Sequence, residues 1–267
     1  MFYSGSNGRY VTRALAVLTP SESKRLIAKA VCRLPEVRGA FDNGRIVIIG
    51  GTTNAYVVEE LLGIAVDKFR FASGRIAFGE LGANDPSMRR PPVVIINGEV
   101  VDGLRPVDVL KEFTANDVYI KGANAVDAEG HAGVLMADGA GGTIGASMGI
   151  IQARGSNLIV PVGLEKLVPS VIDAAGRCGQ DGFAYSMGLS VGLMPLVDAK
   201  VITEVQAIEV LFGREGVRAH HVASGGVAGC EGAVVLAIEG EDGEGVKKAF
   251  EFLQSVKGEV AVGPGEE

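Results

Sequence analysis

The segment RIVIIGGTTNAYVVEELL, residues 45–62, combines the features of one unit of regular structure. Four of its first five residues are β-branched, which is typical of a strand buried on both faces of a parallel sheet. Two glycines and two threonines follow, and a helix-forming pattern begins near residue 55. A strand, a glycine-rich turn and a helix make the first half of a βαβ unit. The segment therefore predicts a parallel sheet in which residues 45–49 form an inner strand.

The same alternation extends to both sides of this segment. Apolar runs at 117–120 and 158–162 predict further strands, and helical spacing predicts helices at 20–34, 106–113, 143–153 and 168–175. Asn97-Gly98 between two apolar runs indicates a β-hairpin. The order of these elements predicts an α/β fold, in which a Rossmann-like parallel-sheet core carries helices on both faces.

The pattern changes after about residue 190. Strands are predicted at 200–203, 217–222, 233–238 and 259–262, and helices at 204–212 and 245–256. This order matches the ferredoxin-like βαββαβ unit. After an irregular arm at 1–13, we therefore expect two domains: an α/β ligand-binding core over 14–190 and a small α+β domain over 191–267.

Charge and hydropathy argue against several classes of partner. The net charge of the 267 residues is −7 and no block of lysine or arginine stands out, so we expect no nucleic-acid partner. No apolar run is long enough to cross a membrane. The N-terminus lacks the apolar core of a signal peptide, so we expect a cytoplasmic protein.

The remaining composition bears on cofactors and assembly. The three cysteines are far apart and form no CxxC motif, which argues against a disulfide framework and against a zinc site. We expect neither a bound metal nor a cofactor. Hydrophobic residues make up 47% of the chain, which leaves room for an interface, and we expect a homo-oligomer.

The loop after the strand at 45–49 is the first candidate ligand site. Its phosphate-binding candidates are Gly50, Gly51, Thr52, Thr53 and Asn54. In open α/β sheets, ligands bind at the carboxyl ends of the strands. The N–H groups and the dipole of the following helix favour an anion there, and threonine hydroxyls add donors. The alternative is a plain turn in which one threonine caps the helix.

A second candidate loop follows the strand at 117–120. Lys121, Asn124 and Asp127 offer a cation, an amide and a carboxylate, so Asn124 is a candidate ligand contact and the two charged residues are candidates for proton transfer. If the sheet is parallel, this loop lies at the same edge as the first. The alternative is a polar turn whose asparagine and aspartate bond the local backbone.

Two more candidates lie further along the chain. Gly141, Gly142 and Thr143 precede a predicted helix and repeat the logic of an anion site, with a capped glycine turn as the alternative. Glu165 follows the strand at 158–162 and stands beside Lys166. This pair is a candidate for acid–base chemistry, with a solvated pair at a helix start as the alternative.

Three segments together resemble one superfamily. They are RIVIIGGTTNAYVVEEL at 45–61, DVYIKGANAVDAEG at 117–130 and GAGGTIGASMGIIQARGSNLIVPV at 139–162. In this order they are similar to the superfamily of ribose-5-phosphate isomerase, glucosamine-6-phosphate deaminase and CoA transferases. The last two segments are also similar to the group of initiation factor 2B and methylthioribose-phosphate isomerase. The resemblance covers roughly residues 20–170. It implies a phosphate-holding loop at 50–54, and the C-terminal unit resembles the small lobe of the isomerase.

The residues that would carry the family's chemistry differ in this chain. Lys121 and Asn124 stand at positions that are acidic in the isomerase, and Ser147 stands near the position of its catalytic glutamate. Asp138 replaces a lysine before the glycine-rich loop. For the nucleophilic glutamate of the CoA transferases, Glu165 is the candidate.

Two functions therefore remain open, together with a structural alternative. The first is a divergent isomerase-like or transferase-like enzyme that binds a small phosphorylated molecule and uses Asp127, Lys121 or Glu165 for chemistry. The second is a non-catalytic sensor or regulator of a sugar phosphate or nucleotide. The third is an oligomeric scaffold.

Overall fold

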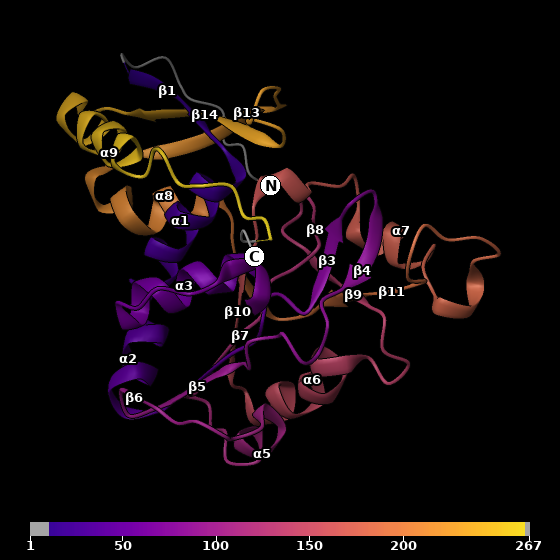
Figure 1. Cartoon of the computed structure of the whole chain (residues 1–267). Coiled ribbons are helices and arrows are strands. Elements are labelled where there is room, and N and C mark those ends of the chain that lie inside the picture. Colours follow the sequence, from indigo (N-terminus) through magenta and orange to yellow (C-terminus); the bar gives the residue numbers. More distant parts are fainter. Residues whose placement is uncertain (1–10, 265–267) are drawn as a thin grey trace.

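The computed structural model describes residues 11–264, and its largest sheet has helices against both faces (Figure 1). In spatial order, the strands of this sheet are β12 (Ala199–Ile202), β10 (Asn157–Pro161), β7 (Val118–Ile120), β2 (Arg45–Ile48), β5 (Val93–Ile96) and β6 (Glu99–Val100). The first four are parallel, whereas β5 and β6 form an antiparallel edge. The predicted α/β class is confirmed, but the sheet is mixed and not wholly parallel.

The β-branched residues of β2 divide between two cores. Ile46 and Ile48 face one core, and Val47 and Ile49 face the other. The helices that contribute to the first core include α1 (Pro20–Val31), α2 (Pro35–Asn43), α3 (Thr52–Leu62), α8 (Glu204–Phe212) and α9 (Gly243–Ser255). The second core is closed by α5 (Pro106–Leu110) and α6 (Gly142–Arg154). The continuous apolar run at 45–49 is explained by this burial on both faces.

A second sheet joins the two ends of the described chain. It contains the antiparallel strands β1 (Thr12–Leu18), β14 (Ala233–Gly240) and β13 (Arg218–Gly225). Helix α8 packs against β13, and α9 (Gly243–Ser255) packs against β1 and β14. In β1, Ala16 and Leu18 are buried while Leu15 and Val17 are exposed, so the strand follows the period of two expected for a sheet with one covered face.

The ferredoxin-like unit predicted after residue 190 is wrong in two of its strands. Its expected first strand is β12, which pairs with β10 in the large sheet, and residues 259–262 form no strand. Strand β1 provides the third strand of the small sheet instead. Residues 1–10 of the predicted arm lie outside the described range, while Thr12 and Arg13 belong to β1.

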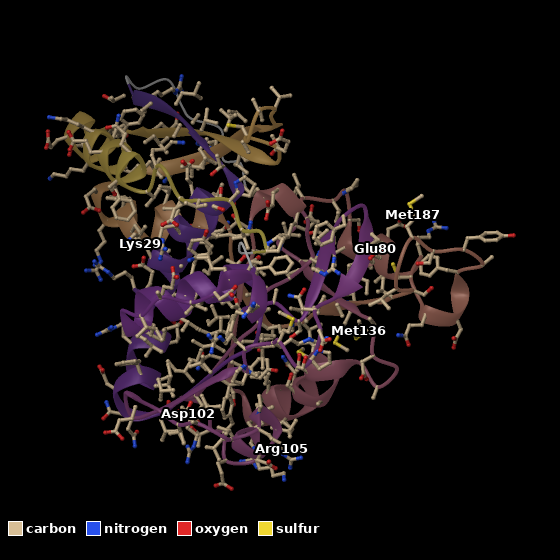
Figure 2. The ribbon with its side chains drawn as sticks, in the orientation of Figure 1. Lys29, Glu80, Asp102, Arg105, Met136 and Met187 are labelled. Carbon is tan, nitrogen blue, oxygen red and sulfur yellow. The ribbon has the colours of Figure 1, made fainter. Side chains whose placement is uncertain are left out.

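The remaining elements lie beside the large sheet (Figure 1). They are α4 (Lys68–Phe71), the hairpin β3 (Gly74–Ala77) and β4 (Glu80–Ala83), the sheet of β8 (Ala125–Val126), β9 (Ala132–Met136) and β11 (Gly192–Leu196), and α7 (Val171–Ala175). Three 3-10 turns complete the described chain, at Leu164–Lys166, Gln180–Gly182 and Gly213–Glu215. Figure 2 shows Met187 at the outer end of this region, near Glu80 of β4.

Turn chemistry explains the two tight hairpins. Asn97 and Gly98 connect β5 to β6 with positive φ values of 48° and 82°, so the predicted hairpin is confirmed. Phe78 and Gly79 connect β3 to β4 with φ values of 57° and 79°. A non-glycine residue seldom takes this conformation, so Phe78-Gly79 does not indicate a hairpin in the sequence as Asn97-Gly98 does.

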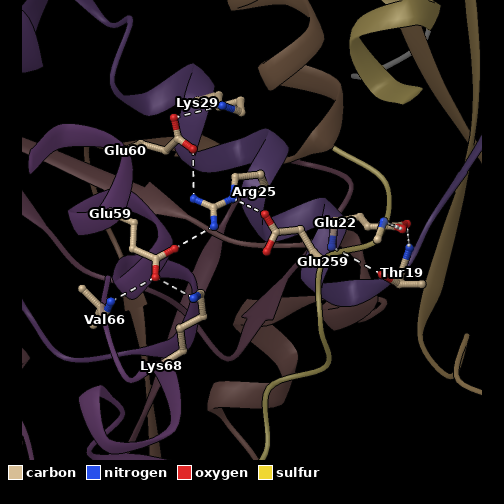
Figure 3. A network of polar contacts seen from close by, with 10 residues as sticks. Thr19, Glu22, Arg25, Lys29, Glu59, Glu60, Val66, Lys68 and Glu259 are labelled. Carbon is tan, nitrogen blue, oxygen red and sulfur yellow. Dashed lines mark hydrogen bonds and ion pairs between the residues drawn. The ribbon is translucent and has the colours of Figure 1, made fainter. Parts of the chain in front are cut away.

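The C-terminal segment 256–264 returns to α1 and α3. Figure 3 shows Arg25 of α1 between Glu59 and Glu60 of α3 and Glu259 of this segment, all three of which accept hydrogen bonds from its guanidinium group. Lys257 pairs with Glu22, whose other oxygen accepts the Gly258 N–H at 3.0 Å. No helix within residues 11–264 has the length and apolar character needed to cross a membrane.

Candidate functional site

The four parallel strands end at one edge of the large sheet. Because β2, β7, β10 and β12 run in the same direction, the residues that follow them meet there. The loop Gly50–Asn54 follows β2 and Lys121 follows β7. Lys166 lies in the 3-10 turn after β10, and Glu204 begins α8 after β12.

Asn54 bridges the ends of the two central strands. Its Nδ2 donates to the carbonyl of Ile49 at 2.7 Å and to that of Ile120 at 3.3 Å. Both acceptors are carbonyls, so the orientation of the amide is fixed and Oδ1 is the free atom. Oδ1 is buried and has no hydrogen-bond partner among the described residues. A buried acceptor without a donor is unfavourable, so this position favours a ligand hydroxyl or a water.

The start of α3 beside Asn54 also has unused donors. Gly51 caps the helix without a side-chain hydrogen bond, and the first N–H that bonds within the helix is that of Ala55. The N–H groups of Thr52 and Thr53 have no partner within residues 11–264. These groups form the positive end of the helix dipole, which attracts an anion.

Three lysines and two glutamates gather at the same edge, and we call them the carboxyl-edge cluster: Lys24, Lys121, Glu165, Lys166 and Glu204. Lys24 of α1 pairs with Glu165 at 2.8 Å, and its side chain is 9% exposed. Lys166 Nζ donates to the carbonyl of Ala123 at 2.9 Å, which holds it beside the chain that follows Lys121.

Lys121 is the cation of this cluster that has no partner. Across residues 11–264, neither a hydrogen bond nor an ion pair engages its Nζ, whereas Lys24 and Lys166 are both held. Burial, together with the positive charge of Lys166, lowers the pKa of Lys121 to about 8. Burial and the charge of Lys24 likewise lower the pKa of Lys166 to about 8, although Glu165 and Glu204 oppose this shift. A bound anion would relieve the repulsion between these ammonium groups.

Glu204 contributes a buried carboxyl group to the cluster. Its Oε2 accepts the N–H of Leu164 at 2.9 Å, while Oε1 is buried without a partner among the described residues. Burial raises the pKa of Glu204, and the nearby Glu165 adds to this shift against the opposing effect of the Leu164 N–H. The group can therefore hold a proton at a pH where an exposed glutamate has lost it.

Asp127, a predicted proton-transfer residue, is fully engaged in local contacts. Its Oδ1 accepts the N–H groups of Glu129 and His131 at 3.1 and 3.0 Å. Its Oδ2 accepts the N–H of Val171 at 2.9 Å and lies 3.1 Å from Nδ1 of His131. Through these four contacts, the carboxylate of Asp127 attaches its own loop to the start of α7.

The third predicted loop already contains an anion of its own. Asp138 Oδ1 accepts the N–H groups of Ala140 and Gly142 at 2.8 and 3.3 Å. The positive end of α6, where Gly141 and Thr143 lie, is therefore neutralised by this carboxylate, and the loop has little affinity left for a phosphate.

Asn124 and Gly50 also have structural roles. The Oδ1 of Asn124 accepts the N–H of Leu135 at 3.1 Å, which ties the loop to β9. A Cβ on Gly50 would lie 2.4 Å from the carbonyl oxygen of Phe71, so only glycine fits there. Of the predicted residues, the structure brings together those at the ends of three strands: Gly50, Gly51, Thr52, Thr53, Asn54, Lys121 and Glu165.

Two residues of the cluster were missed in the sequence. Lys24 lies on a helix 141 residues from Glu165, and nothing local indicates that the two meet. Glu204 follows an apolar strand, as Lys121 does, and the position after a predicted strand is the signal that identifies both. Glu204 was not selected because Thr203-Glu204 also matches the start of a helix. The structure does place the start of α8 there.

A second concave region lies beside the C-terminal segment. This open groove has a volume of about 440 Å³, and its cations are Arg25, Lys29, Lys68 and Lys257. Each of the four is paired with a glutamate, as Figure 3 shows for the network around Arg25. Among residues 11–264, the groove therefore has no unpaired cation, unlike the carboxyl edge.

Comparisons of the chain with family models, with curated proteins and with solved structures gave no match.

Proposed function

We propose that this protein binds a small phosphorylated molecule at the carboxyl edge of β2, β7 and β10. The phosphate would lie between Lys121 and the N–H groups of Thr52 and Thr53. A ligand hydroxyl would donate to Oδ1 of Asn54. A phosphorylated molecule with a hydroxyl group, such as a sugar phosphate, supplies both kinds of contact.

The observation that carries this proposal is that three kinds of polar group without a hydrogen-bond or ion-pair partner lie together at this edge. Lys121 has no partner within residues 11–264, the first N–H groups of α3 have none, and Asn54 Oδ1 is buried without a donor. The first two groups favour negative charge, and the third requires a donor. The ends of β2 and β7 are adjacent, because Asn54 bonds both of them.

The relation to the superfamily of ribose-5-phosphate isomerase and glucosamine-6-phosphate deaminase is part of the proposal. What supports it is the order of a parallel strand, a glycine-rich turn and a helix at 45–62, followed by a parallel strand that ends at Lys121. We favour an enzyme over a sensor because the cluster contains groups that titrate at unusual pH, namely Lys121, Lys166 and Glu204. Assembly into a homo-oligomer in the cytoplasm also remains a proposal.

A thermal-shift experiment tests the binding site. The melting temperature should rise with inorganic phosphate and ribose-5-phosphate and stay constant with ribose. A ligand at a hundredfold excess over its dissociation constant stabilises the folded state by about 2.7 kcal/mol, which is readily measured. Lys121→Met should abolish most of the shift, because it removes the free cation.

Lys248→Met is the matched control. Lys248 is an exposed lysine of α9, on the other sheet, so its loss should leave the phosphate shift unchanged. A shift of equal size in the Lys121 variant would refute the proposed site. The absence of any shift with phosphorylated compounds in the unmodified protein would refute the proposed ligand class.

A further inference from the structure

The paired lysines at the carboxyl edge have a chemical consequence beyond binding. The amine of lysine is a nucleophile only when it is neutral, and burial or a neighbouring cation makes the neutral form accessible. Lys121 meets both conditions, since it is half-buried and faces the charge of Lys166. Most lysines of the described chain lack this arrangement because they are solvated or paired with a carboxylate.

Within residues 11–264 no carboxylate pairs with the amine of Lys121, and its pKa of about 8 makes the neutral form accessible. Lys166 is fixed to the carbonyl of Ala123 at 2.9 Å, so its charge remains close to Lys121. Glu165, the nearest carboxylate in the sequence, is already paired with Lys24 at 2.8 Å. Glu204 is buried, and its Oε2 accepts the N–H of Leu164. Among the charged groups that α1, the turn after β10 and α8 bring near, none within residues 11–264 forms an ion pair with Lys121.

We infer that Lys121 forms a Schiff base with the carbonyl group of a phosphorylated aldehyde or ketone, and that Lys166 is the positioning residue that keeps its amine reactive. The inference rests on the proposed phosphate site, and it defines the substrate class further as a carbonyl compound. An aldose or ketose phosphate in its open-chain form belongs to this class.

The reaction balances without another reactant. The lone pair of the neutral Nζ attacks the carbonyl carbon, the C–N bond forms, and the electron pair of the C=O π bond moves to oxygen. The oxygen takes one proton from the nitrogen to give a carbinolamine. It then takes the second and leaves as water, and the nitrogen lone pair forms the C=N bond. No electron is exchanged with an outside oxidant or reductant.

The backbone that follows Lys121 is not crowded at Gly122. Gly122 follows Lys121, and a Cβ placed on it would lie 3.8 Å from Asn54 Oδ1, with no closer side chain. The buried Oδ1 of Asn54 is in place to accept a hydrogen bond from a hydroxyl near the reacting carbon.

Reductive trapping tests this inference. Pyridoxal 5′-phosphate, a phosphorylated aldehyde, serves as the probe, and sodium borohydride converts its Schiff base into a stable secondary amine that peptide mass spectrometry locates. We expect saturable labelling at Lys121, competition by inorganic phosphate, and roughly tenfold weaker labelling by pyridoxal, which lacks the phosphate. Labelling spread over exposed lysines such as Lys247 and Lys248, without preference for Lys121, would overturn the inference.

Two variants separate the reactive role from the binding role. Lys121→Arg keeps a cation but cannot form an imine, so the phosphate-induced thermal shift should persist while the label at this position disappears. Lys166→Met removes the neighbouring positive charge, so the pKa of Lys121 should rise. The labelling rate at Lys121, measured from about pH 6 to about pH 10, should then reach half of its maximum at a higher pH. An unchanged midpoint would overturn the role of Lys166.

The two proposals fail in different ways. A phosphate shift without a trapped adduct at Lys121 would overturn the Schiff base and leave the binding site standing. The absence of both would overturn the binding site as well. A trapped adduct at Lys121 that inorganic phosphate does not displace would support the amine chemistry and contradict the phosphate site.

Discussion

Burial of Glu204 makes the stability of the fold depend on pH. Its carboxyl group is fully enclosed at the start of α8, and burial raises its pKa above the ordinary 4.5. The folded state therefore binds this proton more tightly than the unfolded state does. The stabilisation is complete at a pH below the pKa that Glu204 has in the unfolded chain. It is lost as the pH rises through the higher pKa that Glu204 has in the folded protein.

Glu204→Gln isolates this effect. Glutamine keeps an acceptor for the Leu164 N–H but cannot ionise. We expect the free energy of unfolding of the unmodified protein to fall, relative to that of the variant, as the pH rises above 4.5, until the difference levels off above the raised pKa. Urea unfolding over a series of pH values measures it. A difference that stays constant with pH would contradict the assignment.

Asp127 shows the opposite behaviour. Burial alone would raise its pKa, but the N–H groups of Val171 and His131 and the His131 ring outweigh this and lower it below 3.8. Asp127 therefore stabilises the fold at a pH above the pKa that it has in the unfolded chain. This stabilisation is lost as the pH falls through the lower pKa that it has in the folded protein. Asp127→Asn should lower the free energy of unfolding at neutral pH by about 1–3 kcal/mol, because the amide nitrogen cannot accept these bonds.

The same variant distinguishes a structural role of Asp127 from a catalytic one. Because Asp127 holds a loop and does not belong to the carboxyl-edge cluster, Asp127→Asn should leave the phosphate-induced thermal shift and the labelling of Lys121 unchanged at a temperature where the variant is folded. Loss of labelling with full stability would restore the proton-transfer role that the sequence predicted for this residue.

At the scale of elements, two of the three glycines of α6, Gly145 and Gly149, are not distinguished by the sequence. A Cβ on Gly145 would lie 2.5 Å from the carbonyl oxygen of Ala140, whereas nothing lies within 4 Å of a Cβ on Gly149. Alanine is favoured over glycine in a helix by about 1 kcal/mol. Gly149→Ala should therefore stabilise the protein by about that amount, and Gly145→Ala should destabilise it. Urea unfolding of both variants tests the opposite signs, and equal effects would contradict the close turn at the start of α6.

Local patterns predicted the elements whose formation is local. The strand at 45–49 and the glycines after it lie where the sequence places them, because β-branched residues and loop glycines act over a few residues. Helix α3 ends at the predicted Leu62 but begins at Thr52, earlier than the predicted start near Ala55. Pairing over long distances could not be predicted in this way. Strand β12 pairs with β10 and β1 with β14, and in each case the partner is selected by the packing of the whole fold.

The site was predictable to a similar degree. The positions after β2, β7 and β10 follow from the sheet rule, which led to Thr52, Lys121 and Glu165. Lys24 belongs to a distant helix and was not accessible to that rule. Asp127 and Asn124 were selected because they are polar and follow a strand, but their hydrogen bonds serve the backbone. Residue type alone does not tell these two roles apart.

At the scale of the whole molecule, the C-terminal segment connects the small sheet to the large one. It leaves α9 and reaches α1 and α3, where Glu259 contacts Arg25, and Lys257 and Gly258 contact Glu22 (Figure 3). Arg25 and Glu22 are largely buried, with side-chain exposures of 14% and 5%. Groups this enclosed are costly to leave unpaired.

Two shortened chains test this connection. A chain that ends at Val256 lacks all three contacts and should lose roughly 2–4 kcal/mol of unfolding free energy, because Glu22 loses its cation and Arg25 one of three carboxylates. A chain that ends at Pro264 keeps these contacts and should match the full chain. Equal stability of the two shortened chains, measured by urea unfolding, would show that the contacts of this segment do not stabilise the fold.

The location of an oxyanion in a crystal tests the central claim most directly. Tungstate is tetrahedral like phosphate, and its anomalous scattering identifies its position without ambiguity. The proposed site predicts a tungsten peak between Lys121 and α3, one W–O bond beyond oxygens that lie about 3 Å from Nζ of Lys121 and from the N–H groups of Thr52 and Thr53. A peak confined to the groove of Arg25, Lys29 and Lys257, or no peak at a saturating concentration, would contradict the proposed site.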